Sequence, residues 1–149
     1  MRAVVQRVSE ACVRVGGEVC GSIGPGLLVY LGIDAQDADA DVDYIVDKVR
    51  RLRVFPDEQD RMNHDVLESG GAVLVVSAFT VSADARKGRR PSFDSAAEPE
   101  TAEAFYEAVC RRLAESGCRV ERGRFRAMMD VRCVNAGPVC ILLDSRRTV

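Results

Sequence analysis

The sequence of 149 residues has few of the side chains that common hydrolytic mechanisms need. It holds a single histidine, His64, and none of its six cysteines forms a Cys-x-x-Cys pair. A serine-type triad would depend on that one histidine, which lies in a polar segment, and a zinc site would have to be assembled from scattered thiols. We therefore expect no metal or other cofactor, and we interpret the cysteines as buried free thiols.

The chain also lacks the features that divide or export a protein. It contains no Pro-, Ser- or Gly-rich linker, no internal repeat and no apolar run long enough for a signal peptide or a membrane span. Since 47% of its residues are hydrophobic, a chain of this length can bury a core by itself. We expect one domain over residues 1–149, located in the cytoplasm.

The net charge is small, but the charged residues are unevenly placed. The formal net charge is −2, which argues against a wholly basic nucleic-acid-binding protein. Acidic residues crowd positions 34–47, whereas basic residues form two groups, Arg86, Lys87, Arg89 and Arg90 in one and Arg119, Arg122, Arg124 and Arg126 in the other. Such asymmetry is typical of a protein that holds phosphates on one side, although a solvated loop would look the same.

The pattern of apolar residues predicts a sheet with two helices. Helices are expected from Asp39 or Asp41 to about Arg53, and from Pro99 to a stop at Gly117. Gly16-Gly17 predicts a two-residue hairpin, and the run 27–33, apolar on both faces, predicts a central strand. Residues 57–71 are expected to form a loop with at most a short strand, and 82–95 an irregular basic segment. Strands are predicted at residues 3–8, 11–15, 19–23, 27–33, 73–81, 119–121, 127–134 and 139–144.

Two short stretches have unusual composition. Asn135, Gly137, Pro138 and Val139 interrupt two apolar runs, and we interpret them as the tip of a hairpin whose Gly-Pro pair can aim bare carbonyl oxygens outward. An ordinary tight turn is the plain alternative. Upstream, the buried run from Val73 ends in Ser77-Ala78-Phe79-Thr80, where small hydroxyl residues flank one aromatic ring.

Together, Ser-x-Phe-Thr and the distant Asn-x-Gly-Pro-Val resemble the D-aminoacyl-tRNA deacylases. The resemblance covers essentially the whole chain, including residues 1–8, 24–29 and 90–93. It implies an α/β fold with a strongly curved, half-barrel-like mixed sheet, two main helices on its outer side, and a homodimer. It also implies hydrolysis of the ester bond of D-aminoacyl-tRNA, and of mischarged glycyl-tRNA, as translation quality control.

The resemblance assigns roles to the first motif and its surroundings. Ser77, Phe79 and Thr80 would form the catalytic pocket for the terminal adenosine and the ester, with Ala78 and Met129 as further pocket residues. Because no base adjoins Thr80 in the sequence, we favour a positioning role over a nucleophilic one. An activated ester held against backbone donors could then be attacked by water or a neighbouring ribose hydroxyl.

The second motif would provide chirality. The resemblance implies that Gly137 and Pro138, joined by a cis bond and flanked by Asn135 and Val139, reach into the partner subunit's pocket and exclude L side chains. Lys87, Arg89 and Arg90 would guide the acceptor end of tRNA. The expected partners are thus tRNA and a second copy of the chain, with no membrane and no DNA.

Two positions depart from the family's pattern. Ala78 stands where the family commonly has Gln, and Cys140 where it has Thr, so hydrogen-bonding groups are lost or weakened. A deacylase with relaxed chirality therefore stays an alternative. So does a non-catalytic RNA-binding or scaffold dimer of the same fold.

Overall fold

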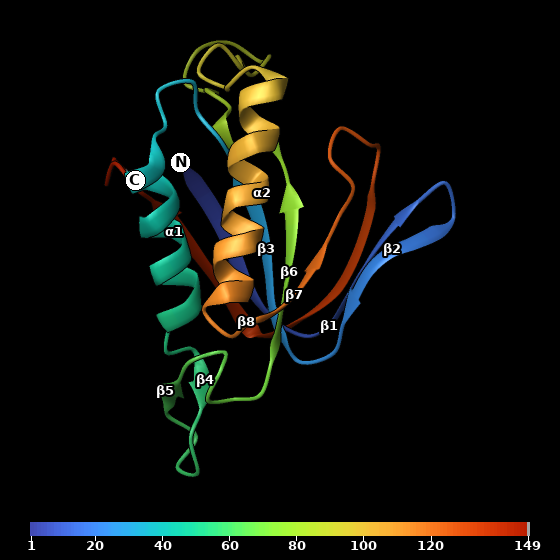
Figure 1. Ribbon diagram of the computed structural model, residues 1–149, viewed down its shortest axis with the longest axis vertical. Helices are drawn as coiled ribbons and strands as arrows, with labels where there is room; N and C mark the ends of the chain where they lie inside the picture. Colours follow the sequence, from blue (N-terminus) through green and yellow to red (C-terminus); the bar gives the residue numbers. More distant parts are fainter. Residues whose placement is uncertain (149) are drawn as a thin grey trace.

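The computed structural model describes residues 1–148 as a mixed sheet with two long helices (Figure 1). The helices are α1, Asp39–Arg51, and α2, Pro99–Glu115, with a short 3-10 helix, η1, at Phe79–Ser82. The strands are β1 Arg2–Val15, β2 Glu18–Ile23, β3 Gly26–Gly32, β4 Phe55–Pro56, β5 Met62–His64, β6 Ala72–Ser77, β7 Arg119–Arg122 and β8 Asp130–Asp144.

The sheet is organised around β1. One edge of β1 pairs with β8 along nearly its whole length, while the other edge pairs first with β3 and then with β2, all antiparallel. β3, β6 and β7 continue the sheet as parallel neighbours. The glycine hairpin between β1 and β2 is confirmed, since Val15 pairs with Glu18 and both intervening glycines have positive φ.

Curvature brings the two ends of this sheet together. Gly21 of β2 lies so close to the Arg122 carbonyl of β7 that a side chain at this position would collide with it. Inside the resulting, nearly closed barrel lies a small apolar cluster that includes Val8, Ile23, Leu28 and Leu74. The predicted curved sheet is therefore confirmed.

Both helices cover the outer side of the sheet (Figure 1). Along β3 the odd-numbered residues Leu27, Val29 and Leu31 face the helices, whereas Leu28 faces the barrel interior, which explains why this strand is apolar on both faces. The buried hydroxyl of Tyr106 on α2 donates to the Val75 carbonyl oxygen at 3.0 Å. This bond ties α2 to the strand that leads into the first motif.

Five of the predicted strands need correction. Residues 3–8 and 11–15 form one strand, β1. Residues 130–134 and 139–144 belong to one strand, β8, that runs through the Gly-Pro pair without turning back, and residues 127–129 precede it. No hairpin tip exists there, because both halves of β8 pair with the continuous β1 and the irregularity is absorbed as shifts in register. The strand predicted at 73–81 ends at Ser77, where the chain winds into η1.

The cysteines were only partly predicted. All six are free thiols, but only Cys110 and Cys118 are buried, and burial raises the pKa of Cys110 to about 11. Cys133 and Cys140 are exposed, so the expectation of buried thiols is wrong for them. Within residues 1–148 there is no group of three or more His, Cys, Asp or Glu side chains arranged to hold a metal ion. The same residues include no helix that is long and apolar enough to span a membrane.

Candidate active site

The end of β6 presents the first motif to solvent. Residues 72–76 are buried, and the Ala78 N–H still bonds to the Leu31 carbonyl oxygen of β3 at 2.9 Å. The chain then turns into η1, whose first hydrogen bond runs from the Val81 N–H to the Ala78 carbonyl oxygen at 3.0 Å. The N–H groups of Phe79 and Thr80 precede that bond and have no partner within the helix.

A pocket of about 680 Å³, which we call the apolar pocket, opens beside this turn. It brings together every residue predicted for the catalytic pocket, namely Ser77, Phe79 and Thr80 with Ala78 and Met129. Its other walls come from β3, from the segment 96–102 at the start of α2, and from residues 125–131. Strands and loops distant in sequence therefore meet around the first motif.

The segment before β8 was missed as a pocket wall. Phe125, Arg126 and Met128 all line the apolar pocket, and the Met128 side chain is 90% exposed at its rim. Arg126 in this segment adopts a positive φ of 59°, which is uncommon for a residue other than glycine. The cluster of Phe and Met among charged residues was the available signal, because exposed flexible apolar side chains are typical of ligand-binding rims.

Phe79 is supported by a second aromatic ring. Its side chain is 58% exposed, and its ring meets the ring of Phe93 edge to face, with centroids 5.1 Å apart and planes inclined by 69°. Phe93 belongs to the segment 82–95, which also carries the first basic group. This stack links the basic segment to the apolar pocket and leaves part of the Phe79 ring accessible.

The pocket holds few groups that could transfer protons. Its walls include neither a histidine nor a carboxylate, and Arg126 is the one charged residue among the lining residues of the described chain. Burial, together with nearby Cys133, raises the pKa of Tyr30, so that hydroxyl stays protonated and can donate a hydrogen bond. The arrangement can position a reactive substrate but offers Thr80 no general base.

Side chains of other segments hold the second motif in place. Asn135 Oδ1 accepts a hydrogen bond from the Val139 N–H at 3.0 Å, and Arg7 Nε donates to the Ala136 carbonyl oxygen at 3.0 Å. The Gly137–Pro138 peptide bond is cis, and Gly137 has φ of 132°. Val139 is buried in the core, whereas Gly137 and Pro138 are exposed. No local pattern in the sequence points to Arg7, because its contact with Ala136 forms only when β1 and β8 pair.

The two motifs do not share one cavity within the chain. Neither Gly137 nor Pro138 lines the apolar pocket, and both are exposed on β8. Nearby on β8, the side chains of Val134 and Leu142 are 50% and 65% exposed. The Gly-Pro pair is therefore free to contact another molecule.

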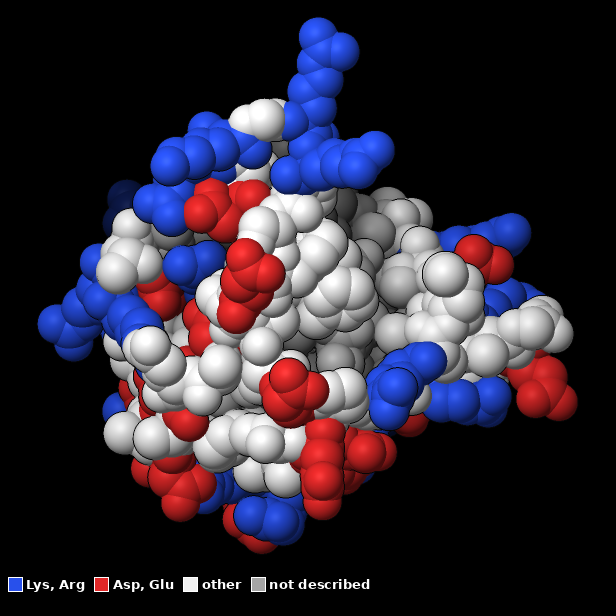
Figure 2. Space-filling model, turned by 90° about the horizontal axis from the view of Figure 1, so that it is seen from above, with Lys and Arg blue, Asp and Glu red and all other residues white. Residues whose placement is uncertain are grey.

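The first basic group lies on the exposed segment at the top of Figure 1. Figure 2 looks down on this end and shows Lys and Arg side chains gathered along one edge of it. Arg86 is paired with Asp84, but Lys87, Arg89 and Arg90 are exposed and form no ion pair within residues 1–148. In the second group Arg122 is paired with Glu107, while Arg119, Arg124 and Arg126 are exposed and form no ion pair within the same residues.

The nearly closed sheet with two outer helices and the paired Ser-x-Phe-Thr and Asn-x-Gly-Pro-Val motifs define the class of protein as a deacylase-type fold. Comparison with known proteins agrees. A model of the family described as D-Tyr-tRNA(Tyr) deacylase matches residues 4–144. The chain belongs to this family.

Curated relatives share most of the sequence. A D-aminoacyl-tRNA deacylase of Anaeromyxobacter dehalogenans is 60% identical over 147 residues, which cover 99% of each chain. One from Symbiobacterium thermophilum is 55% identical over 148 residues, covering 99% of this chain and 98% of that protein.

Solved structures agree on the fold. A structure titled c-Myc DNA Unwinding Element Binding Protein has 39% identity and a TM-score of 0.92, covering 97% of this chain and 98% of that one. A probable eukaryotic D-amino acid tRNA deacylase, at 17% identity and a TM-score of 0.79, shows the same fold over 95% of this chain and 97% of its own.

Proposed function

We propose that the chain hydrolyses the ester bond between a D-amino acid and the 3′ end of tRNA, releasing free tRNA as translation quality control. Mischarged glycyl-tRNA is a further substrate, and the reaction takes place in the cytoplasm, where aminoacyl-tRNA is used. The observation that carries the proposal is the apolar pocket, where Ser77, Phe79 and Thr80 converge. Family membership supplies the reaction.

In this mechanism the protein positions a bond that is already reactive. The exposed face of Phe79 stacks against the terminal adenine, and the N–H groups of Phe79 and Thr80 point toward the ester, where oxyanion charge develops. Water or the vicinal ribose hydroxyl supplies the attacking oxygen. Because no base adjoins Thr80 in the pocket, its hydroxyl orients the substrate or the water and forms no covalent intermediate.

Chirality is read by a second copy of the chain. Gly137 and Pro138 are exposed and lie outside their own apolar pocket, while exposed Val134 and Leu142 give β8 an apolar surface suited to a symmetric homodimer. Carbonyl oxygens of the Gly-Pro pair then occupy, in the partner subunit's pocket, the space that an L side chain would need. Buried Val139 and the hydrogen bond from its N–H to Asn135 Oδ1 hold the Gly-Pro pair in place.

The direct test compares release of tyrosine from D-Tyr-tRNA and from L-Tyr-tRNA. Rapid release from the D ester with background release from the L ester is expected. Equal, background release from both would refute the enzyme and favour the non-catalytic RNA-binding alternative.

Mixing two variants tests the shared site. Phe79→Ala has a damaged pocket and should be inactive, whereas Gly137→Ala keeps its pocket but loses the Gly-Pro pair that excludes L esters. After random exchange of subunits, each mixed dimer joins the intact pocket of Gly137→Ala to the intact Gly-Pro pair of Phe79→Ala, so an excess of Phe79→Ala should suppress release from L-Tyr-tRNA while release from D-Tyr-tRNA is kept. Unchanged release from L-Tyr-tRNA after exchange would show that each site is built from one chain.

A further inference from the structure

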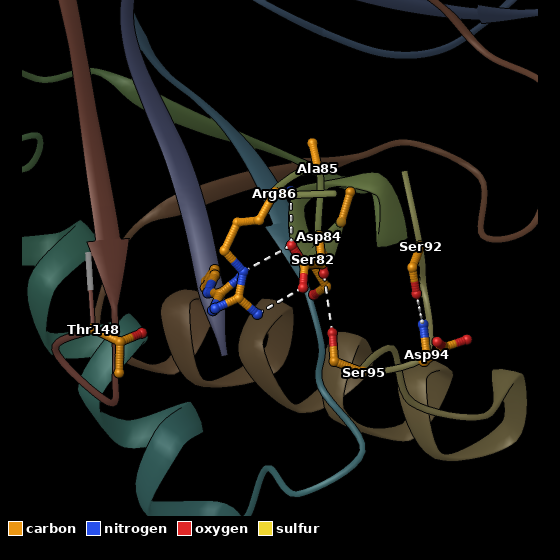
Figure 3. A pocket seen from close by; sticks show the side chains of 10 residues that line it. Ser82, Asp84, Ala85, Arg86, Ser92, Asp94, Ser95 and Thr148 are labelled. Atoms are coloured by element: carbon orange, nitrogen blue, oxygen red, sulfur yellow. Dashed lines mark hydrogen bonds and ion pairs between the residues drawn. The ribbon is translucent and has the colours of Figure 1, made fainter. Parts of the chain in front are cut away.

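A second cavity lies at the other end of η1. Whereas the apolar pocket touches the first residues of η1, this cavity, which we call the polar pocket, begins at its last residue, Ser82, and encloses about 610 Å³ (Figure 3). Its remaining walls come from the segment 83–95, from Arg2 at the start of β1 and from Thr148. None of these residues takes part in the proposed reaction.

Two donors in this pocket are left without acceptors. Ser82 is only 1% exposed, yet its Oγ forms no hydrogen bond with any residue of the described chain. The same holds for the buried Nε of Arg2, within residues 1–148. Buried donors without acceptors destabilise a fold, so a pair of them beside a cavity points to a ligand that supplies the acceptors.

The acidic groups near Arg2 are already occupied. Asp84 accepts hydrogen bonds from Arg86 through its backbone N–H, Nε and Nη2 (Figure 3), and these bonds hold the pKa of Asp84 far below its ordinary value. Burial alone would raise the pKa of Asp144, but hydrogen bonds from Thr148 and Arg146 lower it to about 2. Arg2 Nε forms an ion pair with Asp144 Oδ2 at 4.0 Å, which is beyond hydrogen-bonding distance, so this nitrogen still has no acceptor.

The chemistry of the free donors selects the ligand. An arginine Nε and a hydroxyl without acceptors suit an oxyanion, and the unpaired Lys87, Arg89 and Arg90 lie on the same segment that walls the pocket. The carboxylates of Asp84, Asp94 and Asp144 around the site disfavour a doubly charged anion. A singly charged phosphodiester satisfies both conditions.

We propose that the polar pocket binds a phosphodiester group of the tRNA strand whose 3′ end enters the apolar pocket, through the guanidinium of Arg2 and the hydroxyl of Ser82. This inference rests on the proposed function and assigns Arg2 and Ser82 to binding of the tRNA substrate. Phe79 and Ser82 are three residues apart, about 6 Å along a 3-10 helix, so one short single strand reaches both pockets. A free phosphate ion has the same chemistry, and the experiment separates the two sources.

Arg2→Gln tests the contact through the salt dependence of RNA binding. With a labelled acceptor-stem RNA ending in CCA, we expect affinity at low salt to fall about tenfold. The slope of log K against log salt should shrink by about 0.7 to 0.9, because one phosphate contact is lost. Arg111→Gln, which removes an exposed arginine paired with Glu115 on α2, is the matched control and should change neither. An unchanged slope in Arg2→Gln would overturn the proposal.

Ser82→Ala separates ligand binding from folding. Removing a buried hydroxyl that has no partner should leave the urea midpoint equal to or above that of the parent. If the hydroxyl bonds to phosphate, RNA affinity should still fall about fivefold, with the salt slope retained, because a neutral group releases no counterion. Parent-like affinity in Ser82→Ala would contradict the proposed contact.

A substrate without phosphate distinguishes this inference from the proposed function. The D-tyrosyl ester of adenosine should be hydrolysed by Arg2→Gln at the parent rate, whereas D-Tyr-tRNA should show a raised KM with an unchanged kcat. Loss of activity on both substrates would make Arg2 structural and overturn the inference. If the parent hydrolyses neither D ester, the proposed function itself fails, whatever the RNA-binding results.

Competition with inorganic phosphate shows whether the polar pocket binds a phosphodiester of tRNA or a free phosphate ion. At constant ionic strength, millimolar phosphate should not displace the RNA from the parent more than chloride does. Displacement that disappears in Arg2→Gln would assign the pocket to free phosphate and overturn the assignment to tRNA.

Discussion

The segment 77–80 carries its motif at the end of β6 and the segment 135–139 carries its motif within β8, and the two are held in different ways. The first lies where a buried strand ends, and main-chain hydrogen bonds such as that from Ala78 to Leu31 fix its course. The second lies within the continuous strand β8, and side chains fix it, Asn135 from within and Arg7 from the neighbouring strand. Within residues 1–148, the first segment lines the apolar pocket and the second does not.

This contrast predicts different responses to mutation. A segment whose course is fixed by main-chain hydrogen bonds keeps its conformation when a side chain is removed. Any loss of activity then reports the role of that side chain. A segment fixed by two side chains loses its shape when either is removed. Substitutions in 135–139 should therefore affect both stability and selectivity, and substitutions in 77–80 mainly the rate.

Gly137→Ala should have the largest effect. Its Cβ would lie 2.9 Å from Val139 Cγ2 and 3.0 Å from Arg7 Nη2, at a φ of 132° that L residues rarely adopt. We expect the free energy of unfolding to fall by about 1 to 3 kcal/mol and the preference for D over L esters to drop at least about tenfold. Urea unfolding and tyrosine release from both esters measure the two effects.

The control for Gly137→Ala is Gly70→Ala. Gly70 also has a positive φ, 70°, but a Cβ there would meet nothing within 4 Å. This variant should lose stability and keep its selectivity. Parent-like selectivity in Gly137→Ala would mean that chirality is read elsewhere.

Asn135→Ala should follow in size. It leaves the N–H of buried Val139 without its acceptor, which should lower the free energy of unfolding by about 1 to 3 kcal/mol and loosen selectivity. Asn135→Asp retains an acceptor oxygen at the same place and should recover most of the loss. If alanine and aspartate behave alike in denaturation and in the D over L ratio, the hydrogen bond does not hold the segment.

Thr80→Ala should reduce the rate by less than about tenfold, since the pocket offers this hydroxyl no base and we assign it a positioning role. Single-turnover hydrolysis of D-Tyr-tRNA gives the measurement, with Ser22→Ala, which removes an exposed hydroxyl on β2, as the control. A rate at the background level would restore Thr80 as a nucleophile.

Phe93→Ala should have the smallest effect. Loss of the edge-to-face contact with Phe79, about 0.5 to 1.5 kcal/mol, frees the Phe79 ring to rotate and should raise KM two- to tenfold while kcat is kept. Phe93→Tyr retains a ring and should behave as the parent. An unchanged KM in steady-state assays of Phe93→Ala would show that Phe79 is held without this contact.

Much of the fold was predictable because patterns within short stretches of sequence indicate the helices and the first hairpin. The period of apolar residues predicted α1 and α2, Pro99 marked the start of α2, and the two glycines after Val15 predicted the first hairpin. The Ser-x-Phe-Thr residues were also identified from the sequence, and the structure places all of them around one pocket. Their roles stay predictions.

The predictions that were wrong concern features that depend on residues distant in the sequence. Gly-Pro between two apolar runs indicates a turn by local chemistry, yet β1 is long enough to pair with both runs and to make them one strand. Cysteine is among the residue types most often buried, yet Cys133 and Cys140 are exposed on β8. The contact of Arg7 with Ala136 joins positions 129 apart in the sequence, which no local pattern reveals.

The sequence by itself determined the two helices, the first hairpin and the family, because hydrophobic periodicity, Pro99, a pair of glycines and two motifs are properties of short stretches. Only the tertiary structure decided what those stretches face. It closed the sheet at Gly21, placed the Gly-Pro pair on the surface outside its own pocket, and left Ser82 and Arg2 with unmatched donors beside a second cavity. Burial and hydrogen-bond satisfaction depend on the pairing of distant residues, and the order of residues along the chain does not specify that pairing locally.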